Sequence, residues 1–400
     1  SIPLLNRKIK SEIKKSTLSL EEGFLNNYNN FLELPEKSFN EEELNGTINS
    51  MTPFKGEIEQ ISGVVYHGGK EHIDKLIKIY HKFSLSNPLH PDLFPEVKNM
   101  EIDLINMVSS LFKGGKDCCG NVTYGGTESL LLTCVTYRDY YKDKYGISNP
   151  NIVAPLSIHP AVDKACHYFG IKLIKVPLYK NTGTSRICDI RKYINSNTIL
   201  LIGSAPSYPH GIIDPISEMG ELAYNKGISF HIDCCMGGFL VPFVEKYNYI
   251  NFNLKGVTSI SMDTHKYGYS LKGSSILLFK SHEHKKYQHF INNYWNGGIY
   301  ASPTMMGSKS GGLIAVTWAS LLYFGKSNFI EYANIIRNNL NYIKNEFANN
   351  DLINIIGEPD LNIIAFSSQK LNIYNIISEM KDKNWKLSIL QNPDAFHMCI

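Results

Sequence analysis

The feature that most restricts the fold is an alternation of short apolar runs with longer amphipathic stretches, which begins near residue 60. The apolar runs predict strands at 151–155, 172–176, 198–202, 229–233, 258–262 and 275–279. The stretches between them predict helices at 128–145, 160–169 and 216–226. This alternation is typical of βα units and predicts an α/β fold.

The length of the chain predicts more than one structural part. A chain of 400 residues exceeds one ordinary hydrophobic core, so we expect two subdomains or one large domain with appendages. We place an N-terminal helical arm at 1–60, a large α/β domain at 61–325 and a smaller domain at 326–400. Within the last part, residues 328–349 predict one long helix, and the pattern that follows is rich in strands.

The N-terminal arm leaves two interpretations open. Four lysines (Lys8, Lys10, Lys14 and Lys15) lie among apolar residues, which suits a basic amphipathic helix at a membrane surface or a solvated arm on a partner subunit. No apolar run reaches the roughly 18–20 residues that cross a bilayer. We expect a cytoplasmic location or the cytosolic face of an internal membrane; an anchor upstream of Ser1 stays open.

Charge and cysteine content argue against nucleic-acid binding and against a metal site. The net charge is +3, from 40 basic and 37 acidic side chains, without the basic excess that nucleic acids attract. The eight cysteines form no C-x-x-C pair. Neighbouring cysteines in a strand point to opposite faces, so we expect no metal and interpret the thiols as reduced, intracellular residues.

The first segment with chemical content is the Gly-Gly turn at Gly125 and Gly126. Two glycines allow the backbone to approach an anion, and the helix that follows presents its N-terminus there. Thr127 and Ser129 add hydroxyl donors. The same residues also make an ordinary turn and helix cap, so this segment alone is weak evidence for a phosphate site.

Asp233 and Lys266 each follow an apolar strand. A carboxylate at the carboxyl edge of a sheet lies where α/β proteins bind ligands, and it can pair with a protonated ring nitrogen or simply cap a loop. A lysine at such a position carries a desolvation penalty, which a Schiff base with an aldehyde removes; a surface lysine is the alternative. Together the three segments supply what a pyridoxal-phosphate (PLP) site requires.

Three longer segments carry a resemblance to a known family: residues 203–211 (GSAPSYPHG), 263–268 (DTHKYG) and 297–303 (GGIYASP). With them the chain resembles the sphingosine-1-phosphate lyase family, from about residue 55 to Ile400. The resemblance implies the aspartate-aminotransferase fold, with a doubly wound, mainly parallel sheet, a smaller α+β domain and a homodimer with shared sites. Relatives continue further, so we expect the smaller domain to be incomplete.

The resemblance also implies roles at the cofactor. Lys266 is the Schiff-base lysine, Asp233 bonds the ring nitrogen, and His159 and Cys235 pack on the two ring faces. The residues implied at the cofactor phosphate are Gly126, Thr127 and His265, with Ser308 reaching across the dimer.

The substrate phosphate is implied at Tyr66, His90 and Lys272, donors that suit a dianion. Without the resemblance, each has a plainer interpretation: a core aromatic, a loop residue and a surface turn. The implied reaction is a retro-aldol cleavage of a phosphorylated sphingoid base, such as sphingosine 1-phosphate, to a long-chain aldehyde and phosphoethanolamine. The general base stays open among a histidine, Lys266 and the substrate phosphate.

Two other functions remain as alternatives. A PLP-dependent amino-acid decarboxylase shares Lys266, Asp233 and His159 but has no use for a second phosphate pocket. A catalytically silent scaffold that binds lipid phosphates is the alternative from another class.

The chain departs from the family at two places. Lys309 and Ser310 stand where relatives usually have Arg-Pro, and Tyr124 replaces a smaller residue before the Gly-Gly turn. Lysine does not reproduce the planar fork of arginine donors, so we expect the detail of the 307–311 loop to differ.

Overall fold

A computed structural model describes residues 33–51 and 57–400. The chain divides between Lys55 and Gly56, and the two parts are described separately. In the first part, α2 (Glu41–Asn49) begins with a capping box in which Asn40 and Glu43 bond reciprocally. The lysine-rich segment of the arm lies outside the described residues.

Seven strands form the main sheet of the second part, in the order β1-β7-β6-β5-β4-β2-β3. Strands β2 to β6 pair in parallel with one another, whereas β7 pairs antiparallel with β1 and β6. The mainly parallel α/β sheet is therefore confirmed. The strands are β1 (Cys119–Thr123), β2 (Asn151–Pro155), β3 (Lys172–Val176), β4 (Thr198–Ser204), β5 (Ser229–Asp233), β6 (Val257–Met262) and β7 (Ser275–Phe279).

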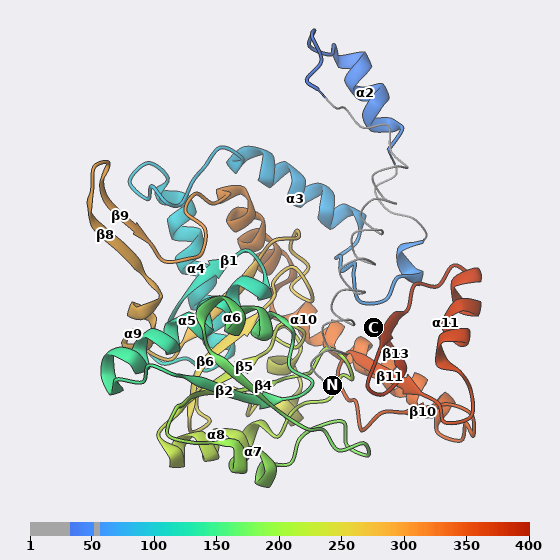
Figure 1. Ribbon diagram of the computed structural model, residues 1–400. Coiled ribbons are helices and arrows are strands. Elements are labelled where there is room, and N and C mark those ends of the chain that lie inside the picture. Colours follow the sequence, from blue (N-terminus) through green and yellow to red (C-terminus); the bar gives the residue numbers. More distant parts are fainter. Residues whose placement is uncertain (1–32, 52–56) are drawn as a thin grey trace. The chain divides into compact units, whose positions relative to one another are not determined.

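Helices cover both faces of this sheet (Figure 1). On one face, α5 (Gly126–Tyr145) and α6 (Ala161–Phe169) pack with Ile152, Leu200 and alternate strand residues. On the other face, α4 (Pro95–Leu111), α8 (Ile216–Lys226) and α10 (Gly311–Phe347) pack with Val153, Leu201 and their neighbours. Successive strand residues point to opposite faces, and helices cover both faces, so apolar residues follow one another along each strand without alternating with polar ones.

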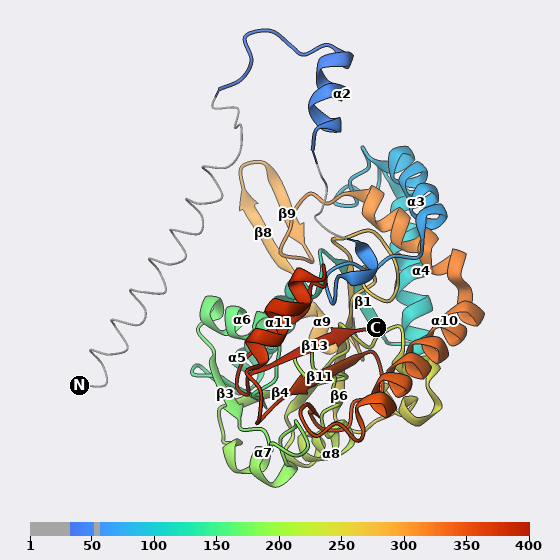
Figure 2. The same ribbon diagram turned by 90° about the vertical axis from the view of Figure 1, so that its right-hand side faces the viewer.

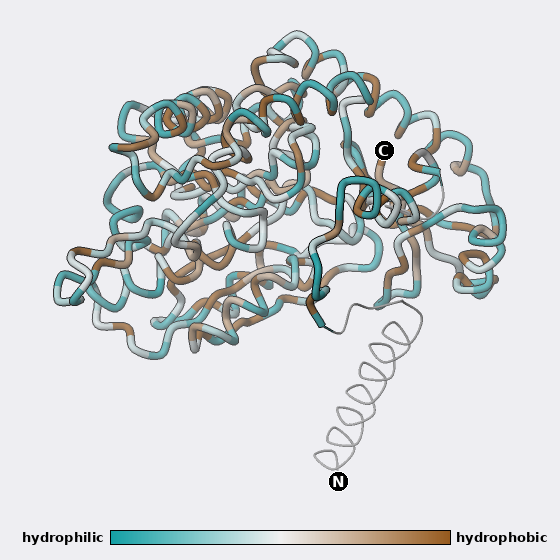
Figure 3. Tube along the Cα trace, turned by 90° about the horizontal axis from the view of Figure 1, so that it is seen from above, coloured by the Kyte–Doolittle hydropathy of each residue, from teal (hydrophilic) through white to brown (hydrophobic). Residues whose placement is uncertain are grey.

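The remaining helices lie around this core. They are α3 (Lys70–Phe83), α7 (Ile187–Tyr193), α9 (His282–Lys285), α11 (Ile373–Asp382) and four short 3-10 turns at Ile58–Gln60, Val241–Phe243, Glu245–Tyr247 and Lys286–Gln288. Hydrophilic and hydrophobic segments alternate along the outer helices (Figure 3), as expected for helices with one buried face.

A second, four-stranded antiparallel sheet has the order β10-β11-β13-β12. It consists of β10 (Asn354–Ile355), β11 (Ile363–Ser367), β12 (Ser388–Leu390) and β13 (Ala395–Cys399), and lies to one side of the main sheet (Figures 1 and 2). Helix α10 packs on α3 and α4 and reaches β10. It is interrupted at Gly325, where φ is 60°. The predicted domain boundary at 325/326 coincides with this interruption and stays a prediction.

A β-hairpin that the sequence did not predict projects from the main body in Figure 1. It consists of β8 (Phe290–Trp295) and β9 (Gly298–Ser302). Its apolar side chains are largely exposed: Phe290, Ile291, Tyr294, Trp295 and Ile299.

Candidate active site

Four strands end at the same edge of the main sheet and present the predicted cofactor residues there. Strand β5 ends at Asp233, which lies beside Ser261 of β6. Lys266 follows the end of β6, the Gly125 turn follows β1, and His159 follows β2. This is the edge at which α/β sheets bind ligands.

Lys266 is paired with Asp263, whose carboxylate lies 2.8 Å from the lysine Nζ. Burial acts to lower the pKa of Lys266, but the charge and hydrogen bond of Asp263, together with Cys235 and Asp233, raise the pKa above its ordinary value. The pKa of Asp263 is lowered: burial acts to raise it, and Lys266 and His265 overcome that effect. The sequence motif contained Asp263, but no role was predicted for it.

The Gly-Gly turn lies against the same groups. Gly125 has a φ of 105° and precedes α5, whose first residue is Gly126. A Cβ on Gly126 would lie 2.8 Å from both the Cys235 sulfur and Asp263 Oδ1, so only glycine fits. Asp263 Oδ1 is buried and has no hydrogen-bond partner among the described residues. A helix N-terminus, a reactive amine and buried carboxylates that converge in this way fit PLP.

His159 has the properties of a neutral ring. Its Nδ1 accepts a hydrogen bond from the Ala161 N–H at 3.1 Å, which leaves the proton on Nε2. Burial lowers the pKa of His159, and the carboxylate of Asp233 only partly opposes this. A neutral imidazole coupled electrostatically to both Asp233 and Lys266 suits stacking on an aromatic cofactor.

Cys235 is held beside Asp233 at the end of β5. Its N–H donates to Asp233 Oδ1 at 2.9 Å, and its sulfur lies 3.7 Å from the Ser261 hydroxyl. Burial raises the pKa of the Cys235 thiol, so it stays protonated. His231, for which no role was predicted, hydrogen-bonds through Nε2 to the Ser261 hydroxyl at 3.1 Å. Burial lowers the pKa of His231 to about 4.

His265 and Thr127 flank the turn. His265 Nδ1 donates to the Ser274 carbonyl at 2.6 Å, and its Cε1 would lie 3.3 Å from a Cβ on Gly125. Thr127 is exposed in the first turn of α5. Both therefore lie at the turn where a phosphate would bind.

Tyr66 and Lys272 come together next to this cluster. Lys272 Nζ lies 4.7 Å from the centre of the Tyr66 ring, a cation–π contact. The Tyr66 hydroxyl donates to the Gly63 carbonyl at 3.1 Å. Burial lowers the pKa of Lys272, and the charge of Lys266 lowers it further. The centre of the Tyr66 ring lies 5.2 Å from that of Tyr267, the residue that follows Lys266.

His90 and Ser308 lie on exposed loops. Both are exposed, and their loops are joined through Asn87, whose amide donates to Ser308 Oγ at 3.1 Å. Within residues 33–51 and 57–400, no hydrogen bond, ion pair or ring contact connects either residue to Lys266 or Lys272. Ser308 therefore contacts the Asn87 loop, and the roles of His90 and Ser308 stay predictions.

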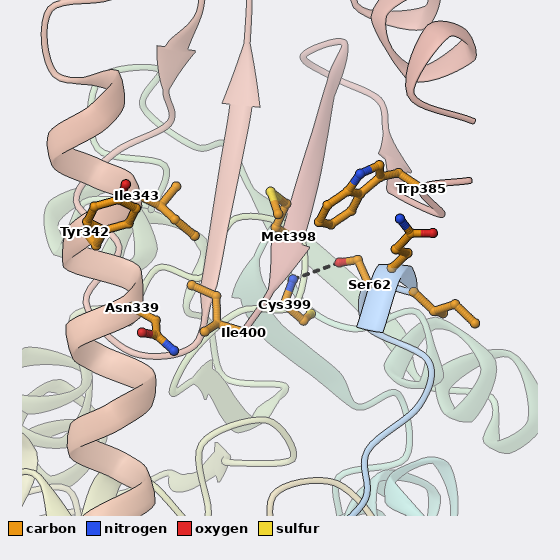
Figure 4. Close-up of a pocket in the computed structure, with 10 residues that line it drawn as sticks. Ser62, Asn339, Tyr342, Ile343, Trp385, Met398, Cys399 and Ile400 are labelled. Carbon is orange, nitrogen blue, oxygen red and sulfur yellow. Dashed lines mark hydrogen bonds between the residues drawn. The ribbon is translucent and has the colours of Figure 1, made fainter. Parts of the chain in front are cut away.

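A separate pocket of about 380 Å³ lies between the end of β13 and α10 (Figure 4). It is lined by Gln60, Ile61, Ser62, Asn339, Tyr342, Ile343, Trp385, Met398, Cys399 and Ile400. None of these is a predicted site residue. The Cys399 N–H donates to Ser62 Oγ at 2.8 Å across one wall of the pocket.

The described residues contain no cluster of three or more His, Cys, Asp or Glu side chains arranged to bind a metal ion. In the same residues, every helix is too short or too polar to cross a bilayer.

Comparison with known proteins places the chain in a family. Residues 86–369 match the model of the pyridoxal-dependent decarboxylase conserved domain. Sphingosine-1-phosphate lyase 1 of Rattus norvegicus is 42% identical, over 100% of this chain and 72% of that protein. The chain belongs to the sphingosine-1-phosphate lyase family. The Saccharomyces cerevisiae member of this family is 39% identical, over 99% of the chain and 70% of its own length.

Solved structures agree with this assignment to the sphingosine-1-phosphate lyases. The Burkholderia pseudomallei enzyme has a TM-score of 0.88 at 33% identity, covering 94% of this chain and 89% of that one. Glutamate decarboxylase of Lactobacillus brevis has a TM-score of 0.82 at 17% identity, covering 94% and 91%, and supports the fold alone. The predicted resemblance is confirmed, and the chain is a PLP-dependent lyase.

Proposed function

We propose that this sphingosine-1-phosphate lyase family member cleaves phosphorylated sphingoid bases to a long-chain aldehyde and phosphoethanolamine. The observation that carries the proposal is the contact of Lys272 with Tyr66, whose ring packs on Tyr267, the residue after Lys266. This pair provides a cation for a second phosphate, in addition to the glycine turn for the cofactor phosphate. An amino-acid decarboxylase needs a site for an α-carboxylate but has no use for a second phosphate pocket.

The residues at the edge of the sheet would hold PLP by complementary contacts. Lys266 would bond the aldehyde carbon, Asp233 the ring nitrogen, and His159 and Cys235 would pack on the ring faces. The phosphate would lie at Gly126, Thr127 and His265. When bound, PLP supplies an electron sink for the charge that develops when the C2–C3 bond breaks.

The protein's own groups then control protons and orientation. Asp263 holds the Lys266 amine at the sheet edge as an ammonium, so a proton must leave before the amine acts as a nucleophile. Asp233 would keep the ring nitrogen of a bound PLP protonated. Lys272 and Tyr66 would orient the substrate phosphate, and removal of the C3 hydroxyl proton falls to a histidine, to Lys266 or to that phosphate.

The proposal includes a homodimer in which His90 and Ser308 serve the partner's site. Two observations support it. Both residues are exposed, and Ser308 hydrogen-bonds to Asn87, three residues before His90, rather than to Lys266 of the same chain. The β8–β9 hairpin also exposes a row of apolar side chains, of which Tyr294 is 90% exposed; such patches mark interaction surfaces.

The proposal places the enzyme in the cytosol or on the cytosolic face of an internal membrane. Its support is the pattern of lysines and apolar residues between Leu4 and Lys15, which suits an anionic lipid surface. Sedimentation with anionic vesicles distinguishes the two locations. Binding of the full chain that is lost when the four lysines are replaced by glutamine supports the membrane surface. Absence of binding contradicts the membrane surface and favours the cytosol.

Product analysis tests the reaction. The holoenzyme is incubated with a phosphorylated sphingoid base, and long-chain aldehyde and phosphoethanolamine are measured by mass spectrometry. We expect both products in equal amounts, and neither from Lys266→Ala. Release of carbon dioxide from an amino acid without aldehyde formation would indicate the decarboxylase instead. A colourless protein that cannot be loaded with PLP would indicate the scaffold.

A further inference from the structure

Tyr124 and Ser310, which lie 186 positions apart in the sequence, contact each other. The Tyr124 hydroxyl oxygen accepts a hydrogen bond from the backbone N–H of Ser310. Tyr124 directly precedes the Gly125–Gly126 turn, and Ser310 lies two residues after Ser308. Proline has no N–H, so this bond requires another residue at position 310.

Ser310 also fixes the start of α10. It is the N-cap of the helix, and its side chain accepts a hydrogen bond from the Leu313 N–H at 3.4 Å. Ser310 therefore connects Tyr124, which precedes the Gly-Gly turn, with the start of α10 and with the Ser308 segment. A bond to its N–H restrains the direction in which the Ser308 segment leaves the body.

Lys309 attaches the same segment to the strand that leads into the turn. Its Nζ donates to the Val122 carbonyl at 3.1 Å and lies 3.6 Å from Glu101 Oε1. Glu101 in turn accepts from the Val122 N–H at 3.2 Å. Lys309 and Glu101 are buried, with 7% and 5% of their side chains exposed, so this is an internal tie rather than a surface ion pair.

Glu128 provides a third connection. It lies in the first turn of α5, where one of its carboxylate oxygens accepts from the Tyr124 N–H and the other accepts from the Met305 N–H at 2.9 Å. The residues from Val122 to Glu128 and those from Met305 to Ser310 thus form one hydrogen-bonded unit.

We propose that Tyr124 is a positioning residue that ties the cofactor-phosphate turn to the segment carrying Ser308. A phosphate bound at the turn would restrain the turn, and the Tyr124–Ser310 bond would then restrain the segment that carries Ser308. The assignment of Ser308 to a cofactor phosphate rests on the proposed function, whereas the Tyr124–Ser310 bond itself does not. The Tyr124 hydroxyl supplies the acceptor, and the Ser310 N–H supplies the donor.

Hydrogen exchange of the cofactor-free protein tests the tie directly. In Tyr124→Phe we expect the Ser310 amide to exchange about three- to tenfold faster, the factor expected for one net hydrogen bond. The matched control is Tyr374→Phe, which removes a hydroxyl on α11 that donates to Asp394. It should leave the exchange rate of the Ser310 amide unchanged. Equal exchange in the wild type and Tyr124→Phe would overturn the proposal.

A double-variant cycle on PLP affinity, read from the absorbance of the bound cofactor, tests the consequence. Ser310→Pro removes the same N–H, and the φ of −72° at Ser310 suits proline. Ser310→Ala removes the cap but keeps the N–H. We expect Tyr124→Phe to weaken PLP binding severalfold in the wild type and in Ser310→Ala, but not in Ser310→Pro. Equal weakening in all three backgrounds would contradict the proposal.

The role of Ser308 is separable from this tie. If Ser308→Ala leaves PLP affinity unchanged, the assignment of Ser308 under the proposed function fails, while the exchange result still decides the tie. Neither measurement requires turnover of a sphingoid base. Failure of the proposed reaction is therefore distinguishable from failure of the positioning role.

Discussion

Replacing Asp263 by asparagine should make Lys266 a much more reactive amine in the cofactor-free protein. Asp263 is buried and Lys266 is largely buried, and the charged atoms of the pair lie 2.8 Å apart. At an effective dielectric constant of about 20, two unit charges at that distance attract by roughly 6 kcal/mol. Asparagine keeps the shape and removes the charge, so burial, which lowers the pKa of Lys266, is then opposed less strongly.

The expected size follows from this attraction. If only a quarter of it appears as proton affinity, the fraction of free amine near neutral pH rises about tenfold. We therefore expect Lys266 in Asp263→Asn to react at least ten times faster with an amine-directed acylating reagent at pH 8. The rate is measured by mass spectrometry of the peptide that contains Lys266.

The control for this prediction is internal to the protein. The exposed Lys192, which pairs with Asp189 three residues earlier on α7, should react equally fast in both proteins. An unchanged or slower rate at Lys266, with Lys192 unaffected, would refute the claim that Asp263 holds this amine protonated.

Three further predictions concern the surroundings of the site. Gly126→Ala should weaken PLP binding at least tenfold in an absorbance titration, because a Cβ there would lie 2.8 Å from the Cys235 sulfur; normal affinity would contradict the tight packing. Burial lowers the pKa of His231 to about 4, so its protonation in the unfolded state removes stability as pH falls from about 6.5 toward 4. The difference in the free energy of urea unfolding between His231→Asn and the wild type should therefore be largest at neutral pH and shrink as the pH falls. A difference that grows in acid would refute this. Lys309→Met should destabilise the fold by about 3 kcal/mol by leaving Glu101 buried with less compensation; Glu101→Gln in the same chain should restore part of this, and additive losses would exclude the pairing.

The sequence predicted the parts of the fold that depend on local pattern. Six strands of the main sheet, β2 to β7, are runs rich in apolar residues, and each appears at its predicted position. Strand β1 was missed because its sequence contains Gly120 and Asn121, which are poor strand formers. Its place at the end of the sheet comes from antiparallel pairing with β7, a contact between residues more than 150 positions apart.

The site divides in the same way. Asp233 and Lys266 were predicted because each directly follows an apolar strand, a position visible in the sequence. Asp263 carried a signal that was not used, an acid three residues before the lysine. Glu101 carried no signal, since its partner Lys309 is 208 residues away and only the fold brings them together.

The most direct test of the assigned substrate site compares Lys272→Met with the wild type on a phosphorylated sphingoid base. We predict that kcat/KM for aldehyde release falls about a hundredfold, as expected when a charged donor to a phosphate is removed, while the absorbance of bound PLP stays the same. An unchanged kcat/KM in a fully loaded Lys272→Met enzyme would show that the substrate phosphate binds elsewhere.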